Sequence, residues 1–171
     1  MRVYLPATTT VLRTLVDQGR LPGPLTAFAV TPGLRSFYAV SEAEADTEEL
    51  EYAALLTAAR ASLRLLDVDP TAARRRVVLA ADVPDSAVEV RDDDPDAERG
   101  TVRVSADIGL RDVASAQIDD TEAENDVRAA VDVVLEADLG SDDAQFVVDQ
   151  AEGHELGWYA TQEIGPALDL L

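Results

Sequence analysis

Three consecutive arginines, Arg74, Arg75 and Arg76, form the densest positive cluster in a chain that has no lysine. A guanidinium group carries a fork of N–H donors that matches a phosphate or a carboxylate. The cluster is therefore a candidate anion-binding site. The alternative is that these arginines pair with the abundant acidic residues of the chain itself.

A second cluster consists of carboxylates. Asp92, Asp94 and Asp96 alternate as in the first half of a calcium-binding loop. Such a loop needs a glycine for its sharp turn and a bidentate glutamate near its end, and Ala97 and Thr101 stand near those places. We therefore expect no metal site here, but a mobile acidic loop over residues 91–100.

The residue inventory excludes much of catalytic chemistry. The chain has one histidine, His154, and no cysteine or lysine, which rules out multi-histidine and thiolate metal sites, disulfides and Schiff bases. Neither G-x-G-x-x-G nor G-x-S-x-G occurs. His154 follows a predicted helix, where a histidine favours the negative end of the helix dipole. We expect no metal and no resident cofactor, and whether the chain is an enzyme stays open.

Aromatic residues gather near the end of the sequence. Trp158 and Tyr159 lie beside Gln162 and Glu163. This patch is a conceivable ligand shelf, but tryptophan more often belongs to a core, so we expect Trp158 to be buried.

Hydrophobic periodicity predicts the elements that must position these groups. Strands are expected over residues 2–5, 25–31, 74–83, 88–90, 102–104, 114–118 and 156–164. Pro6 should end the first strand, and the last segment could instead be a helix. The strands 88–90 and 102–104 could pair across the loop between them. Helices are expected from a threonine cap at 8–10 to Gly19, over 34–39 and 47–66, from a capping box Thr121-x-x-Glu124, and after Ser141, with one further helical turn at 110–113. The 171 residues suit one domain, 1–171, of the α/β or α+β class: a mixed β-sheet with packed helices.

One predicted helix, over residues 47–66, carries a face rich in alanine, including Ala54, Ala58 and Ala61. Small side chains allow close approach, so another element must pack against this face. Homo-oligomerisation through this helix is one possibility.

The net charge of −20 comes from 34 acidic residues against 14 arginines. Residues 119–155 hold thirteen acidic residues and one arginine. A GC-rich genome or adaptation to high salt would each explain this composition. Either way it disfavours direct binding to nucleic acid, which requires a basic face. The N-terminus lacks a signal-peptide apolar run and no window could cross a bilayer, so we expect a cytoplasmic protein with no membrane association.

The motifs MRVYLPAT, LTAFAVTP, EELEYAALLTAARASLRLL, RRRVVLAADVP, AQFVVD and HELGWYATQEI resemble an uncharacterised actinobacterial protein family, a domain of unknown function. The resemblance covers nearly the whole chain, and it implies no activity.

The order of elements is also similar to that of small ADP-ribosyltransferase-like domains, which bind NAD across a split sheet. This resemblance implies a ligand site in which Arg2 takes the place of an early histidine or arginine and Thr31 or Tyr38 that of a middle polar residue. Tyr4 would share the cleft. No late glutamate is clearly placed, and the first-strand histidine of several relatives is absent.

These observations favour a non-enzymatic regulatory or protein-binding module whose acidic stretch, Asp119 to Glu155, attracts a basic protein partner. The alternative is an NAD- or nucleotide-binding enzyme of the ADP-ribosyltransferase-like type, degenerate or active.

Overall fold

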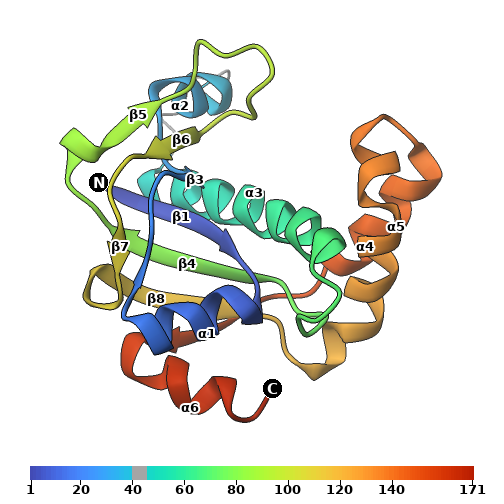
Figure 1. Cartoon of the computed structure of the whole chain (residues 1–171). Coiled ribbons are helices and arrows are strands. Elements are labelled where there is room, and N and C mark those ends of the chain that lie inside the picture. Colours follow the sequence, from blue (N-terminus) through green and yellow to red (C-terminus); the bar gives the residue numbers. More distant parts are fainter. Residues whose placement is uncertain (40–45) are drawn as a thin grey trace.

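The computed structural model describes residues 1–39 and 46–171. They form a seven-stranded sheet in the order β5-β6-β3-β1-β4-β8-β9 and a small sheet of β2 and β7 (Figure 1). All described pairings are antiparallel, which makes the fold α+β. The strands are β1 (Arg2–Ala7), β2 (Arg20–Leu21), β3 (Leu25–Phe28), β4 (Val77–Asp82), β5 (Val88–Val90), β6 (Thr101–Val104), β7 (Ile108–Gly109), β8 (Val113–Ile118) and β9 (Gly157–Ala160).

Helices cover both faces of the sheet. They are α1 (Thr9–Gln18), α2 (Pro32–Tyr38), α3 (Thr47–Val68), α4 (Glu124–Asp138), α5 (Asp142–Glu152) and α6 (Ile164–Leu168). Helices α1 and α6 lie on one face and α3 crosses the other (Figure 1). Along β1, Val3 and Leu5 join the core under α1, whereas Tyr4 joins the core under α3, as the alternation of a strand requires. The predicted single domain of the α/β or α+β class is confirmed, and the antiparallel pairings assign it to α+β.

Helix α3 is the central support of one layer. Asp46 caps its start by accepting a hydrogen bond from the Glu48 amide, and its alanine face is buried against the sheet at Ala54, Ala58 and Ala61. The predicted close packing is thus satisfied within the chain, which leaves this face unavailable to a second copy. Homo-oligomerisation itself stays a prediction.

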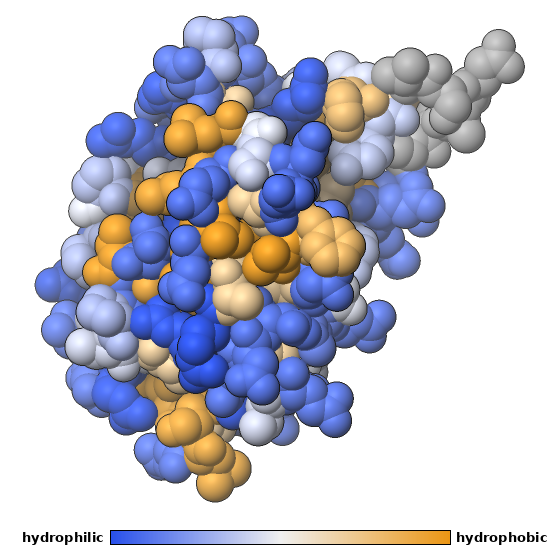
Figure 2. Space-filling view, turned by 90° about the vertical axis from the view of Figure 1, so that its right-hand side faces the viewer, coloured by the Kyte–Doolittle hydropathy of each residue, from blue (hydrophilic) through white to orange (hydrophobic). Residues whose placement is uncertain are grey.

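Helices α4 and α5 form a hairpin that packs on the C-terminal half of α3. Its core joins Leu63 and Leu66 of α3 to Val127, Val134 and Val148. Hydrophilic residues cover most of the face that carries the hairpin, and hydrophobic surface gathers in its middle (Figure 2). No helix of the described ranges is long and apolar enough to span a membrane.

Several local predictions are confirmed. Thr8 caps α1 and Gly19 ends it, and Ser141 caps α5. Strands β5 and β6 pair across the loop of residues 91–100. A 3₁₀ turn over residues 110–112 interrupts the segment from β7 to β8.

Other predictions were wrong at the boundaries. Pro6 does not end β1, because the β1–β3 register includes only Tyr4 and Phe28, and a strand tolerates proline where no partner needs its amide. The strand expected over 25–31 stops at Phe28, and Thr31 caps α2 instead. The expected strand 156–164 is β9 followed by the 3₁₀ turn 161–163 and α6.

The capping box was also wrong. Asp120, not Thr121, caps the first turn by accepting from the Glu122 amide. The side chains of Thr121 and Glu124 both accept hydrogen bonds from Arg75. The Arg75 guanidinium thus binds both side chains that a capping box would have required.

Candidate functional site

Three neighbouring cavities follow the outer side of α3. The first, of about 510 Å³, and the second, of about 330 Å³, share Tyr38, Thr57 and Glu98. The third, of about 400 Å³, shares Leu56 with the second. We call this row of three adjacent cavities the α3 groove. Its walls are α2 and residues 91–100 at one end, the α4–α5 hairpin in the middle, and β8 with β9 at the other end.

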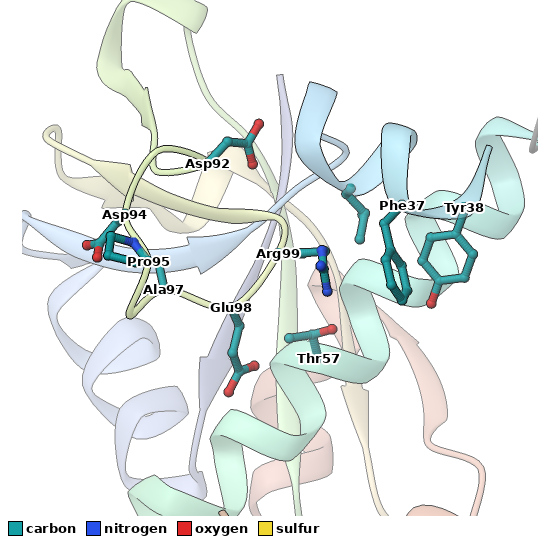
Figure 3. A pocket seen from close by; sticks show the side chains of 10 residues that line it. Phe37, Tyr38, Thr57, Asp92, Asp94, Pro95, Ala97, Glu98 and Arg99 are labelled. Atoms are coloured by element: carbon teal, nitrogen blue, oxygen red, sulfur yellow. The ribbon is translucent and has the colours of Figure 1, made fainter. Parts of the chain in front are cut away.

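The first cavity lies between α2 and the loop of residues 91–100 (Figure 3). The guanidinium carbon of Arg99 lies 4.1 Å from the centroid of the Phe37 ring, a cation–π geometry. Phe37 and Tyr38 meet edge to face with ring centroids 5.3 Å apart. Both rings are exposed, so this end of the groove offers aromatic surface beside the carboxylates of Asp92 and Glu98.

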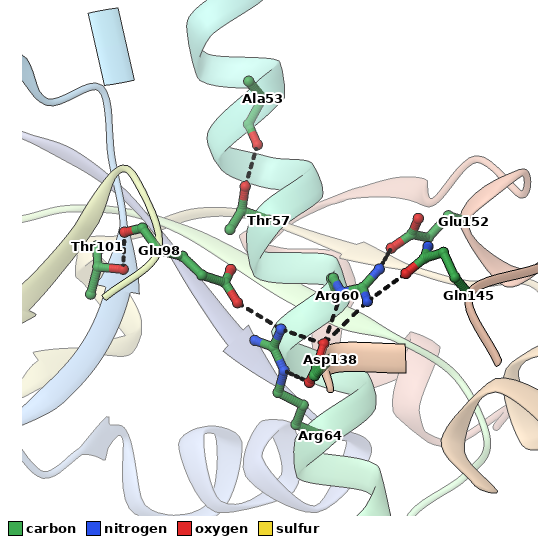
Figure 4. A network of polar contacts seen from close by, with 9 residues as sticks. All are labelled: Ala53, Thr57, Arg60, Arg64, Glu98, Thr101, Asp138, Gln145 and Glu152. Atoms are coloured by element: carbon green, nitrogen blue, oxygen red, sulfur yellow. Dashed lines mark hydrogen bonds and ion pairs between the residues drawn. The ribbon is translucent and has the colours of Figure 1, made fainter. Parts of the chain in front are cut away.

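An ion network joins the two sides of the groove across α3 (Figure 4). Arg64 Nη2 lies 2.6 Å from Glu98 Oε1, and Arg64 Nε lies 2.7 Å from Asp138 Oδ2. One turn earlier, Arg60 contacts Asp138 at 3.1 Å and also binds Glu152 and Gln145. The hydrogen bond from Arg64 holds the pKa of Asp138 below its usual range, and Arg60 adds to this. The network therefore fixes the loop and the hairpin relative to α3.

The third cavity has aromatic walls. Trp158 of β9 is 64% exposed and Tyr52 of α3 is 55% exposed, and both line it. Gln117 of β8, only 8% exposed, also lines it. Its Nε2 donates to Ser115 Oγ at 2.9 Å, whereas its Oε1 has no hydrogen-bond partner among residues 1–39 and 46–171. Such a buried unpartnered acceptor is uncommon in a native fold.

The three clustered arginines all have internal acceptors. Arg74 donates to the carbonyl oxygens of Leu66 and Asp69. Arg75 donates to Glu124 and Thr121, and Arg76 to Asp119. In the structure these arginines therefore pair with acceptors of the chain itself. An incoming anion would have to displace these acceptors.

The residues implied by the ADP-ribosyltransferase resemblance do not share one cleft. Arg2 forms a two-pronged pair with Asp82 at 2.8 and 2.9 Å, and Tyr4 is buried under α3. Thr31 accepts from the Leu34 amide and donates to Asp92. Tyr38 alone of the four lines the α3 groove.

The acidic loop is held by internal contacts. Asp92 accepts from Thr31 and from the Gly33 amide, and Asp94 pairs with Arg91 at 2.8 Å. Across residues 1–39 and 46–171, no group of three or more histidines or carboxylates is placed to hold a metal ion. The mobility expected for this loop stays a prediction.

The acidic stretch divides into two sets. One set faces arginines or the histidine: Asp119, Glu124, Asp126, Asp138 and Glu152. The other set is exposed on the hairpin and includes Asp132, Glu136, Asp142 and Asp143. Only the second set can act as a solvated acidic face.

Sequence reasoning missed most of the groove. Trp158 was expected in the core, but β9 is an edge strand and α3 leaves its face open, so the ring is exposed. Tyr52 and Leu56 of α3 were not singled out. They lie off the buried alanine face of α3, and large apolar residues on the solvent side of a helix are a signal that could have identified them.

Comparison with known proteins identifies a family that covers nearly the whole chain. The model described as "Family of unknown function (DUF6912)" matches residues 1–168. No curated protein and no solved structure matches the chain.

Proposed function

The chain belongs to the DUF6912 family of unknown function, and we propose that it is a protein-binding module that holds a basic segment of a partner protein in the α3 groove. The observation that carries this proposal is the row of exposed large apolar side chains along one groove: Phe37, Tyr38, Tyr52, Leu56 and Trp158. Aromatic residues in a concave surface are typical anchors of protein recognition.

Charge complementarity selects the kind of partner. Of the acidic residues that line the groove, Asp94, Glu98 and Glu152 are paired with arginines. Asp92 and Glu155 form no ion pair with an arginine in the part of the chain that the structure describes, so they are the carboxylates left to meet a basic partner. Of the arginines of the groove, Arg60 and Arg76 are neutralised by internal carboxylates, and Arg99 stacks on Phe37. A chain with a net charge of −20 also attracts basic partners at long range.

The charged groups of the groove serve mainly to hold one another. Arg60, Arg64, Asp138 and Glu98 complete their hydrogen bonds within the network described above. A preformed, internally satisfied surface suits recognition, because it costs little to order on binding. This supports the non-enzymatic reading over a catalytic one.

The test is selection from two libraries of 12-residue peptides on beads. One library is randomised over Arg, Lys, Leu and Phe, and the other replaces Arg and Lys by Glu. We expect binders from the basic library alone, with affinity that falls as NaCl rises. Fluorescence anisotropy of a labelled binder then gives Kd for the protein and its variants.

Two exposed aromatic residues offer a matched pair of variants. Trp158 lies in the groove, and Phe146, 67% exposed, lies on α5 and lines none of its three cavities. Trp158→Ala should weaken peptide binding about tenfold or more, as for a central anchor. Phe146→Ala should leave Kd unchanged. Equal effects of the two variants, or equal binding of both libraries, would overturn the proposal.

A further inference from the structure

We propose that the third cavity of the α3 groove, between Tyr52 and Trp158, is a receptor for an arginine side chain. This inference rests on the proposed function in one respect only, that the arginine belongs to the bound segment. The cavity is lined by Tyr52, Leu55, Leu56, Gln117, His154, Glu155, Leu156 and Trp158.

The two aromatic rings provide faces for a cation. Tyr52 comes from α3 and Trp158 from β9, so the rings belong to two separate walls of the cavity. Tyr52 is 55% exposed and Trp158 is 64% exposed, so both rings are open to a ligand. A guanidinium over the face of a tryptophan or tyrosine ring is among the strongest cation–π arrangements in proteins.

Gln117 supplies a buried acceptor behind the inner wall of the cavity. It pairs with Trp158 in the register of β8 and β9, so the two side chains leave the sheet on the same face. The Gln117 side chain is more than nine-tenths buried, and its Oε1 has no partner among the described residues. The oxygen has almost no accessible surface, so a ligand reaches it only when a neighbouring side chain moves aside. A guanidinium brings five N–H donors and can then satisfy this oxygen while its plane stacks on an aromatic ring. An aliphatic ligand would leave the oxygen unpartnered.

The charges around the cavity exclude an anionic ligand. Of the described residues that line the cavity, Glu155 is acidic and none is an arginine. The one basic side chain of the lining is His154, whose Nε2 lies 2.7 Å from the carboxylate of Asp126. A carboxylate or phosphate would therefore meet negative charge without a free cationic partner. Arginine is preferred to lysine, because a planar, weakly hydrated guanidinium loses less on entering a half-closed aromatic site.

The chain offers a direct reporter for this cavity, because Trp158 is its one tryptophan. The first experiment titrates the purified protein with N-acetyl-arginine amide into the millimolar range and records intrinsic fluorescence. The matched control ligand is N-acetyl-citrulline amide, which has nearly the same shape without the charge. We expect a saturable change with the arginine amide and at least a threefold weaker response to the citrulline amide. Equal responses, or no response to either, would overturn the inference.

Variants locate the response. Tyr52→Leu should weaken the arginine response several-fold by removing one ring, and Gln117→Leu should do so by removing the acceptor while keeping the volume. Phe146→Leu removes an aromatic ring outside the cavity and should leave the response unchanged. Melting curves establish that each variant is folded. If Tyr52→Leu and Gln117→Leu are folded and respond like the unsubstituted protein, the cavity is not the receptor.

Selected peptides separate this inference from the proposed function. Replacing the critical arginine of a peptide by citrulline should raise Kd about tenfold and abolish its effect on Trp158 fluorescence. A peptide that binds by anisotropy without changing that fluorescence would overturn the arginine receptor and leave groove binding standing. A response to arginine amide without any peptide binding would overturn the proposed peptide binding and leave the arginine receptor standing.

Discussion

Arg76 and Asp119 form two parallel hydrogen bonds, Nε to Oδ2 and Nη2 to Oδ1, each of 2.8 Å, with side chains only 1% and 0% exposed. The same carboxylate accepts a hydrogen bond from the Arg76 backbone amide, and the Arg76 guanidinium also donates to the carbonyl oxygen of His154 at 2.9 Å. This pair therefore joins the start of β4, the end of β8 and the segment before β9. That segment leads into Trp158, so the pair supports one end of the α3 groove.

The first prediction concerns this pair. Arg76→Met should lower the free energy of unfolding by about 3–5 kcal/mol, because it leaves the Asp119 carboxylate buried without its partner. The double variant Arg76→Met/Asp119→Leu should be only about 1–3 kcal/mol less stable than the unsubstituted protein, since the remaining loss is the unpartnered Arg76 amide and the His154 carbonyl oxygen without its donor. Urea unfolding followed by circular dichroism measures both. A double variant less stable than Arg76→Met would contradict this account.

The second prediction uses the pKa of Asp138. The hydrogen bond from Arg64 holds this pKa below its usual range, so folding favours the carboxylate. The resulting stability is present above the unfolded-state pKa of about 4 and is lost as the pH falls through the folded-state value. Asp138→Asn should therefore lower the free energy of unfolding by about 1–2 kcal/mol at neutral pH. The difference should shrink below pH about 4.

Asp132→Asn is the matched control for that prediction. Asp132 lies exposed on the same helix, and its removal changes the net charge equally. It should leave stability nearly unchanged at both pH values. Urea midpoints at neutral and acid pH measure both variants, and a penalty for Asp138→Asn that persists in acid would argue against the network.

Local sequence signals predicted the elements well. Thr8, Gly19 and Ser141 act within one turn of where they stand, and their roles follow from the backbone groups beside them. The capping box at Thr121 failed, because Arg75 competes from another element for the same two side chains. A contact that bridges 46 positions in the sequence leaves no local pattern.

The groove could not be predicted for the same reason. Its third cavity brings together Tyr52, Gln117 and Trp158, which come from α3, β8 and β9. The strand order that places β9 at the sheet edge is a property of the whole chain. Trp158 is exposed because β9 lies at the sheet edge and α3 does not cover that part of the sheet. The residue type alone would have favoured burial.

The third prediction concerns the end of the loop of residues 91–100. Gly100 has a φ of +83°, and a Cβ there would lie 2.9 Å from the Ala29 carbonyl oxygen. Gly140 has a φ of +100°, and a Cβ there would meet nothing within 4 Å. Gly140→Ala should therefore show only the conformational penalty, about 1–2 kcal/mol. Gly100→Ala should lose more, because the backbone must also move away from the oxygen.

Thermal unfolding compares the two glycine variants directly. Gly100 also accepts a hydrogen bond from the Ala29 amide at 2.8 Å, so the shift should loosen the junction between the loop and β3. Equal losses for the two variants would mean that the loop relieves the clash without strain.

The fourth prediction concerns Tyr4. Burial raises the pKa of its phenol, the charge of Glu51 adds to this, and Arg2 opposes it. In the unfolded chain the phenol loses its proton near pH 10, so stability is complete below that pH and falls as the pH rises toward the folded-state pKa. Tyr4→Phe should shift alkaline unfolding to higher pH, even if it changes stability at neutral pH. Circular dichroism against pH measures the midpoint, and an unchanged midpoint would contradict the prediction.

The fifth prediction separates attraction from retention of a basic peptide. Asp142 and Asp143 are exposed on the first turn of α5 and line none of the groove cavities described above. Asp142→Asn/Asp143→Asn should lower the association rate several-fold at low salt, because long-range attraction steers encounters. The dissociation rate should stay unchanged, and the difference should vanish in high salt, where the field is screened within a few ångströms.

Trp158→Ala should show the opposite pattern in the same measurement. Its ring contacts the peptide only after docking, so its loss should raise the dissociation rate and leave the association rate nearly unchanged. Stopped-flow anisotropy at low and high NaCl resolves both rates. If the aspartate variant changes dissociation instead, the hairpin contacts the peptide directly, and the binding surface extends from the α3 groove onto α5.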